Sequence, residues 1–201
     1  YLVPVVQAAT HKRHLAVYIF SLGPTPQQII INSWHNGRCE ALGDHLNSIS
    51  SDLALLQQRH LTYPVLHFFH SKQVETSVSV SVAALDEALT ILKYGIATEY
   101  VLPQAVFLPS RQIITAFLNT LHEAQIKPAS EPPPPSSLDE LRRHDIPVVD
   151  DDVYFERLES ISGRRRLLSG LVHDCAHNWE EIFTLKSPEI AVQPKKEQKK
   201  R

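Results

Sequence analysis

Apolar residues recur along this chain at helical spacing, and this periodicity is the feature that most limits its possible folds. Two stretches alternate spacings of four and three residues; their members are Leu42, Leu46, Ile49, Leu53 and Leu56 in the first, and Val78, Val82, Leu85, Leu89 and Leu92 in the second. Such spacing places one apolar stripe along an α-helix. No strand–helix–strand rhythm occurs in the sequence. We therefore predict an all-α fold, a helical bundle of antiparallel hairpins.

Each apolar stripe covers about two heptads, which is shorter than the three or four that a stable coiled coil needs. We therefore expect both stripes to pack within the domain and not between subunits. A charged side chain in the first stripe should then prevent folding. Leu53→Asp is the substitution that tests this expectation.

Residues typical of helix ends predict where further helices begin and end. Thr25 can cap a helix that has Pro26 at its first position. Gly95 should end the helix of the second stripe in a left-handed conformation. Further helices are predicted after Pro109, over residues 138–144, from residue 150 to about 174, and around residues 179–183.

A proline-rich stretch, residues 127–137, interrupts the helical pattern with four consecutive prolines. Such a run favours the extended polyproline II conformation and acts as a semi-rigid spacer. We interpret it as a linker between a main helical domain, residues 23–126, and a smaller C-terminal helical segment, residues 138–184. Residues 185–201 form a basic tail that we expect to be solvated and disordered.

The charge distribution excludes one class of partner. The last seven residues carry five basic side chains and one acidic one. The remaining chain has 15 basic and 21 acidic residues, a net charge of about −6. A nucleic-acid-binding domain is expected to have a basic face, so we predict no nucleic-acid partner. Two widely separated cysteines, Cys39 and Cys175, fit free thiols in a reducing compartment.

No pattern of catalytic residues is present. The sequence has no glycine-rich phosphate loop and no nucleophile elbow. Asp86 and Glu87 are adjacent in a helix, so they point in different directions and do not make an acid–base pair. The acidic run 150–152 stands where negative charge stabilises a helix N-terminus, and the basic run 164–166 either balances that charge or lies on a solvated face. We predict no catalytic residue and no cofactor.

Histidines make metal binding the remaining chemical possibility. The candidate ligands are His67, His70, His173 and His177. A zinc site needs three or four ligands, and the apolar residues around His67 and His70 favour histidines packed in or beside the core. The dipeptide His173-Asp174 also occurs in metal-dependent phosphohydrolases, but no later aspartate is present to complete their ligand set. We therefore expect none of the four to hold a metal ion.

The N-terminal residues allow two interpretations. Residues 1–9 are apolar and are followed directly by His-Lys-Arg-His at positions 11–14. This is the pattern of the cytoplasmic end of a transmembrane helix, where basic residues stay on the inner side. It is equally the pattern of a buried helix in a soluble protein. The chain contains no methionine, so we expect it to be part of a longer protein.

Several strings resemble one known family. They are residues 63–71 (YPVLHFFHS), residues 85–90 (LDEALT), the initial YLVPV and residues 22–34 (LGPTPQQIIINSW). Together they are similar to the cytoplasmic region of prokaryotic two-transmembrane-helix ion channels of the potassium-channel type. The resemblance covers residues 1–121, and more loosely residues 146–179.

This resemblance implies a function that involves no catalysed reaction. The chain would be the cytosolic assembly or gating domain of a homotetrameric cation channel at the inner membrane, with its own pore module and identical subunits as partners. Residues 1–22 would be the end of the inner pore helix and a juxtamembrane helix, with Lys12 and Arg13 near the membrane surface. The T-x-G-Y-G filter signature of the family is absent, so no selectivity residue can be assigned. The alternatives are a soluble helical adaptor and a histidine-rich metal-dependent hydrolase.

Overall fold

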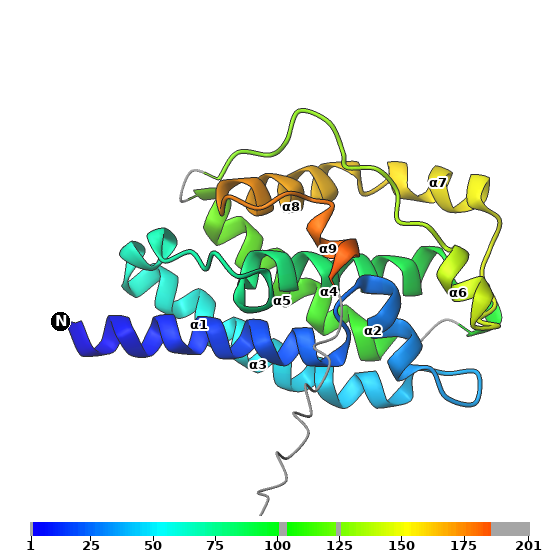
Figure 1. Cartoon of the computed structure of the whole chain (residues 1–201), viewed down its shortest axis with the longest axis horizontal. Helices are drawn as coiled ribbons and strands as arrows, with labels where there is room; N and C mark the ends of the chain where they lie inside the picture. Colours follow the sequence, from blue (N-terminus) through cyan, green and yellow to red (C-terminus); the bar gives the residue numbers. More distant parts are fainter. Residues whose placement is uncertain (1, 101–103, 124–125, 186–201) are drawn as a thin grey trace, which may run out of the picture.

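The computed structural model describes residues 2–100, 104–123 and 126–185, and this part of the chain is all-α without a β-strand (Figure 1). The predicted fold class is therefore confirmed. The α-helices are α1 (Leu2–Leu22), α2 (Pro26–Ser33), α3 (Glu40–Thr62), α4 (Val78–Tyr94), α5 (Gln104–Glu123), α6 (Asp139–Arg143), α7 (Asp151–Glu159), α8 (Ser162–Asp174) and α9 (Glu181–Thr184). The short 3₁₀ helices are η1 (Pro64–Phe68), η2 (Val74–Thr76) and η3 (Thr98–Tyr100).

Helix α4 is the centre of the molecule. Every residue from Val78 to Leu92 is buried, and the helix contacts α1, α2, α5 and α8 (Figure 1). The sequence predicted a single apolar stripe on this helix, but all its faces are covered. Its small and β-branched side chains allow neighbouring helices to approach from several directions.

The long helices alternate in direction along the chain. Contacts between His11 and Asp52 and between Tyr18 and His45 show that α1 and α3 run antiparallel. Helix α3 lies parallel to α5, where the Ser50 hydroxyl donates to the Ser110 hydroxyl (2.9 Å between oxygens).

The predicted stripe of α3 is fully buried within this chain, so the expectation that it packs inside the domain is confirmed.

Three details of the predicted helices differ from the structure. Helix α5 begins at Gln104 and contains Pro109 in its interior, where the proline removes one hydrogen bond of the helix. The helix predicted from residue 150 to 174 is divided into α7 and α8 at residues 160–161. Gly95 has φ −100° and is not left-handed. A Cβ atom there would lie 3.1 Å from the Ile91 carbonyl oxygen and 3.1 Å from Leu138, so close packing explains the glycine.

Buried residues from α1 to α9 form one hydrophobic core. It includes Leu15 of α1, Leu85 of α4, Leu168 of α8 and Ile182 of α9. The predicted segments 1–22, 23–126 and 138–184 therefore share this main core, and Val5, Ala8 and Leu66 form a second, smaller cluster. The basic tail predicted over 185–201 lies outside the described residues after Leu185.

The proline-rich stretch does not act as a spacer. It runs across the surface of α8 (Figure 1), where the Ala129 amide donates to the Arg166 carbonyl at 2.9 Å. Pro133 and Ser136 are buried. The earlier interpretation as a linker is wrong because carbonyl groups of this stretch accept hydrogen bonds from arginines of α8, as described below. We refer to residues 127–137 as the strap.

Candidate functional site

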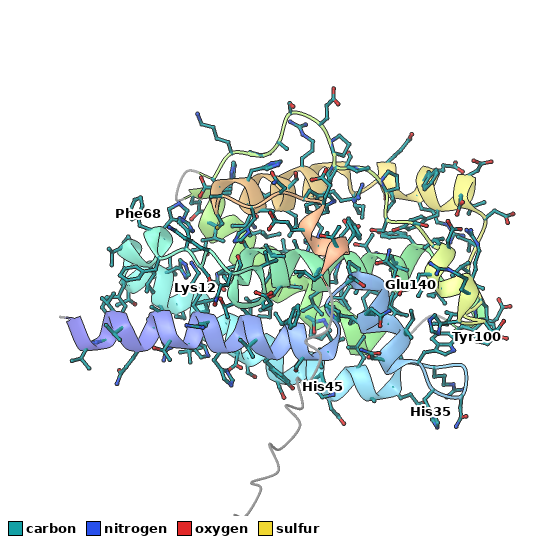
Figure 2. All side chains as sticks on the ribbon, viewed as in Figure 1. Lys12, His35, His45, Phe68, Tyr100 and Glu140 are labelled. Carbon is teal, nitrogen blue, oxygen red and sulfur yellow. The ribbon has the colours of Figure 1, made fainter. Side chains whose placement is uncertain are left out.

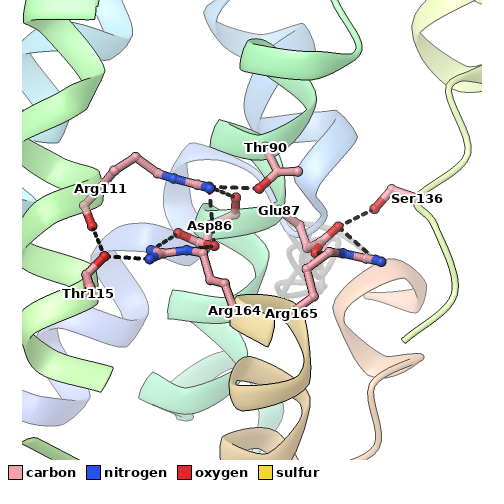
Figure 3. A network of polar contacts seen from close by, with 8 residues as sticks. All are labelled: Asp86, Glu87, Thr90, Arg111, Thr115, Ser136, Arg164 and Arg165. Carbon is pink, nitrogen blue, oxygen red and sulfur yellow. Dashed lines mark hydrogen bonds and ion pairs between the residues drawn. The ribbon is translucent and has the colours of Figure 1, made fainter. Parts of the chain in front are cut away.

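Buried ion pairs connect α4 to the helices around it (Figure 3). Asp86 accepts from Arg164 through both carboxylate oxygens, at 2.6 and 2.8 Å, and lies 3.3 Å from Arg111. Glu87 accepts from Arg165 at 2.8 Å and from the Ser136 hydroxyl of the strap at 2.8 Å. The two carboxylates therefore hold α5, α8 and the strap against α4.

These groups are almost completely removed from solvent. The side chains of Asp86, Glu87 and Arg165 are 1%, 0% and 3% exposed. Burial alone would raise the pKa of Asp86, but Arg111 and Arg164 outweigh it and hold that pKa below its usual range. Arg165 also donates to the carbonyls of Pro133 and Pro134, both at 2.8 Å. A charged, fully bonded and inaccessible network is a structural element and offers no site to a substrate.

This network was not predicted from the sequence. The run 164–166 was expected to balance Asp150–Asp152 or to lie on a solvated face, whereas Arg165 is buried and Arg164 binds Asp86. Asp151 pairs instead with Arg142, at 2.5 Å. Asp150 does stand at the N-cap of α7, but its side chain makes no capping hydrogen bond. One signal was available: two acids inside a helix of otherwise small and apolar residues indicate burial with partners from elsewhere.

A second polar group lies where α8 ends beside the chain that follows η1. We call His67, His70, Asp174 and Cys175 the His70 cluster. His67 Nε2 lies 3.2 Å from an Asp174 carboxylate oxygen, and the His67 and His70 rings are 5.7 Å apart between centroids. Ligand atoms of His70, Asp174 and Cys175 all lie within 4.8 Å of one another.

Lys12 of α1 fixes the chain around this cluster. Its ammonium group donates to the Phe69 carbonyl at 3.0 Å and to the Leu66 carbonyl at 3.4 Å. Figure 2 shows Lys12 pointing from α1 toward this part of the molecule. Burial lowers the pKa of Lys12. Its neighbour Arg13 is exposed.

A cavity of about 410 Å³ opens beside the His70 cluster. Its lining includes Lys12, Arg13, His70, Ser79 and Cys175. Burial lowers the pKa of His70, and burial raises the pKa of the Cys175 thiol. At neutral pH the imidazole of His70 is therefore neutral and the thiol of Cys175 is protonated.

The structure regroups the histidines that the sequence singled out. His67 and His70 meet Asp174 and Cys175, which directly follow the candidate ligand His173 in the sequence. His173 is exposed and stays apart from this group. His177 is already engaged, because its ring nitrogens lie 2.7 Å from a Glu181 carboxylate oxygen and 2.9 Å from the Ser71 carbonyl.

Apolar side chains are exposed at the end of the molecule that carries the N-terminus. We call this group the apolar end; its members are Val3, Val6, Leu61, Val65 and Phe68. Val3 is 67% exposed and Phe68 is 75% exposed, and Figures 1 and 2 place the start of α1 and Phe68 at the same end. In the described residues, no helix combines the length and apolar character that crossing a membrane requires.

The chain is similar to a protein named uncharacterized membrane protein YdjJ from Bacillus subtilis (strain 168). The two are 36% identical over 179 residues, which cover 89% of this chain and 52% of that protein. The chain thus spans about half the length of the curated relative it matches. No family model matches the sequence, and no solved structure matches it.

Proposed function

We propose that this chain is the cytosolic assembly or gating domain of a homotetrameric cation channel of the potassium-channel type. The resemblance of residues 63–71 and 22–34 to that family motivates the proposal. A relative that is named a membrane protein and is about twice as long supports it. In this proposal the pore module is a separate part of the full-length protein, and the domain described here performs no reaction.

The observation that carries the proposal is the position of α1. Its first turns expose Val3 and Val6 at the apolar end, whereas Leu15, Ala16 and Ile19 lie in the core. The helix is continuous between these two regions, from Leu2 to Leu22. A continuous helix is stiff, so a displacement at the pore would reach the packing of α1 against α3 and α4.

The test uses the full-length protein. Its reading frame should encode two membrane spans and a pore loop upstream of Tyr1. After reconstitution into liposomes, the protein should conduct potassium or thallium ions, measured as flux with a fluorescent indicator. Absence of the spans and pore loop, or absence of flux from a folded full-length protein, would show the proposal to be wrong.

A coupling variant tests the role of α1 directly. Three glycines inserted between Thr10 and His11 break the continuous helix on the N-terminal side of Leu15, Ala16 and Ile19, so these core residues stay in place. We expect the tetramer to form and the flux to change by about tenfold or more, equivalent to about 1.4 kcal/mol of lost coupling. The matched control inserts the same glycines after Gly37, in the turn between α2 and α3, and should leave flux unchanged. Equal flux from both insertions would contradict the proposed coupling.

The second candidate function is a soluble helical adaptor, and the apolar end favours it as well. Exposed Phe68, Val65 and Leu61 would form the contact with a helical partner. In that case the reading frame would lack membrane spans. Phe68→Ser would then abolish partner binding without changing the stability of the domain.

A further inference from the structure

We propose that His70, Asp174 and Cys175 bind one divalent transition metal ion of the Zn²⁺ class, with His67 as a positioning residue. This inference is independent of the channel proposal, because it concerns ligands within this chain. The residues come from two segments that are distant in the sequence and meet at the edge of the cavity beside α1.

The spacing of the ligand atoms fits a tetrahedral ion after a small adjustment. One imidazole nitrogen, one carboxylate oxygen and the Cys175 sulfur lie within 4.8 Å of one another. Zinc bonds of about 2.0–2.3 Å place neighbouring ligand atoms about 3.3–3.6 Å apart. His70 and Asp174 are exposed, so rotation of their side chains can supply the remaining ångström or so without moving the backbone.

The kinds of ligand select the kind of metal. Thiolate and imidazole favour zinc and similar transition metals over Mg²⁺ and Ca²⁺, which prefer oxygen ligands. Binding releases the proton of the Cys175 thiol to solvent, and the resulting thiolate and the Asp174 carboxylate balance the charge of a divalent ion. The occupied site would be neutral, so it would not repel the ammonium group of Lys12 nearby. His70 and Cys175 line the cavity, so a water molecule from it would take the fourth coordination position.

His67 holds the carboxylate ligand in place. Its Nε2 atom is 3.2 Å from Asp174 Oδ2, which leaves the other carboxylate oxygen available for the metal. Such outer partners orient the ligands of many metal sites, and their removal typically weakens metal binding about 10–100-fold.

Metal binding here would join the end of α8 to the chain after η1. Lys12 donates to this part of the molecule as well, to the Leu66 carbonyl in η1 and the Phe69 carbonyl directly after it. A bound ion would therefore stabilise the anchor of α1 on the domain. The site would make the position of α1 sensitive to the concentration of the metal.

The experiment titrates Co²⁺ into the reduced, metal-free 201-residue chain and follows its absorption spectrum. We expect one equivalent to bind, with a thiolate-to-cobalt charge-transfer band and the visible bands of a tetrahedral ion. Zn²⁺ should then displace the cobalt and raise the melting temperature.

Variants identify the ligands. Cys175→Ser should abolish the charge-transfer band. His67→Ala should keep the band and weaken Zn²⁺ binding about 10–100-fold. His70→Gln should weaken Zn²⁺ binding more than His67→Ala does, by about 100-fold or more. The matched controls are Cys39→Ser, which removes the other thiol, and His173→Gln, which removes the exposed histidine beside Asp174. Both controls should bind like the parent chain. Circular dichroism of each metal-free variant checks that it is folded.

Three results would overturn the proposal. The first is the absence of one-to-one binding. The second is a charge-transfer band that survives Cys175→Ser or is lost in Cys39→Ser. The third is equal weakening by His173→Gln and His70→Gln, which would indicate adventitious binding to surface histidines. His70 is exposed, so its substitution should not impair folding. The comparison of His70→Gln with His173→Gln therefore tests the proposal even if Cys175→Ser misfolds.

Discussion

At the scale of single residues, Arg165 and Glu87 show how strongly this fold depends on charges that solvent does not reach. Arg165→Met leaves the Glu87 carboxylate buried with only the Ser136 hydroxyl as a partner. Removing one member of a buried ion pair typically costs about 3–5 kcal/mol. We expect a loss of this size in the free energy of unfolding, measured by urea denaturation.

The double variant Glu87→Gln/Arg165→Met removes both charges and should recover most of that loss. Arg143→Met, at an exposed position of α6, is the control and should change stability little. A loss below about 1 kcal/mol for Arg165→Met would show that water reaches the pair.

His60 makes stability depend on pH. Burial lowers its pKa from 6.5 to about 4 in the folded protein, and its Nδ1–H donates to the Leu56 carbonyl at 3.0 Å. Above pH 6.5 the ring is neutral in both the folded and unfolded states. As pH falls from 6.5 toward 4, the unfolded chain takes up a proton that the folded chain excludes, so stability decreases by up to about 3 kcal/mol.

His60→Gln removes this contribution, so urea denaturation should show a smaller decrease in stability for the variant over the same pH range. His14→Gln, at an exposed position, should behave like the parent chain. An unchanged pH dependence in His60→Gln would mean that the ring protonates in the folded state.

The sequence predicted which single residues are buried better than it predicted which residues contact one another. The spacing of Leu42 to Leu56 is a local pattern and identified buried positions correctly. Pairing between Asp86 and Arg164 joins residues 78 positions apart, and no local pattern records it. The same holds for His70 and Cys175, which only the folding of α8 against the chain after η1 brings together.

At the scale of helices, α3 offers a matched pair of substitutions. Leu53 is fully buried and Leu55 is 45% exposed. Leu53→Asp places a carboxylate in the core without a partner, and we expect the chain to lose its folded circular dichroism spectrum. Leu55→Asp should change stability by less than about 1 kcal/mol. A folded monomer of Leu53→Asp would mean that α3 uses this stripe for contacts between subunits.

Helix α8 contains two glycines in contrasting surroundings. A Cβ atom at Gly170 would collide with the Lys127 carbonyl of the strap, whereas one at Gly163 meets no atom within 4 Å. Gly170→Ala must therefore displace the strap, at an expected cost of about 1–3 kcal/mol. Gly163→Ala should stabilise the helix by about 0.5–1 kcal/mol.

Thermal unfolding of the two variants makes the comparison. Equal melting temperatures would show that the strap moves away without loss of stability.

The helical periods of α3, α4 and α5 were predictable because amphipathic spacing is a property of each segment alone. The division between α7 and α8 was not predicted, although Ser160, Ser162 and Gly163 are residue types common at helix ends. The strap was misinterpreted for a different reason. Consecutive prolines favour an extended backbone, but whether that backbone spans solvent or lies on a helix depends on its partners, here the arginines of α8.

At the scale of the whole molecule, one core predicts one cooperative unit. A chain ending at residue 126 would lack α8, so Asp86 and Glu87 would lose Arg164 and Arg165. We expect this fragment to lack a cooperative thermal transition, measured by circular dichroism. A chain ending at residue 185 keeps every described contact and should unfold cooperatively. Cooperative unfolding of the shorter fragment would show that residues 1–126 form an independent domain.

The separation in sequence between the acids of α4 and the arginines of α8 also determines when these residues can pair during synthesis. A ribosome that has just completed Asp86 and Glu87 must add 78 more residues before the partners exist. At about 5–20 residues per second, this takes roughly 4–16 s. Asp86 can meet Arg111 early in that interval, but Glu87 has no arginine partner until α8 is made. The charge of Glu87 keeps the nascent helix hydrated and discourages premature association, until the arrival of α8 turns this charge into a late connection of the fold.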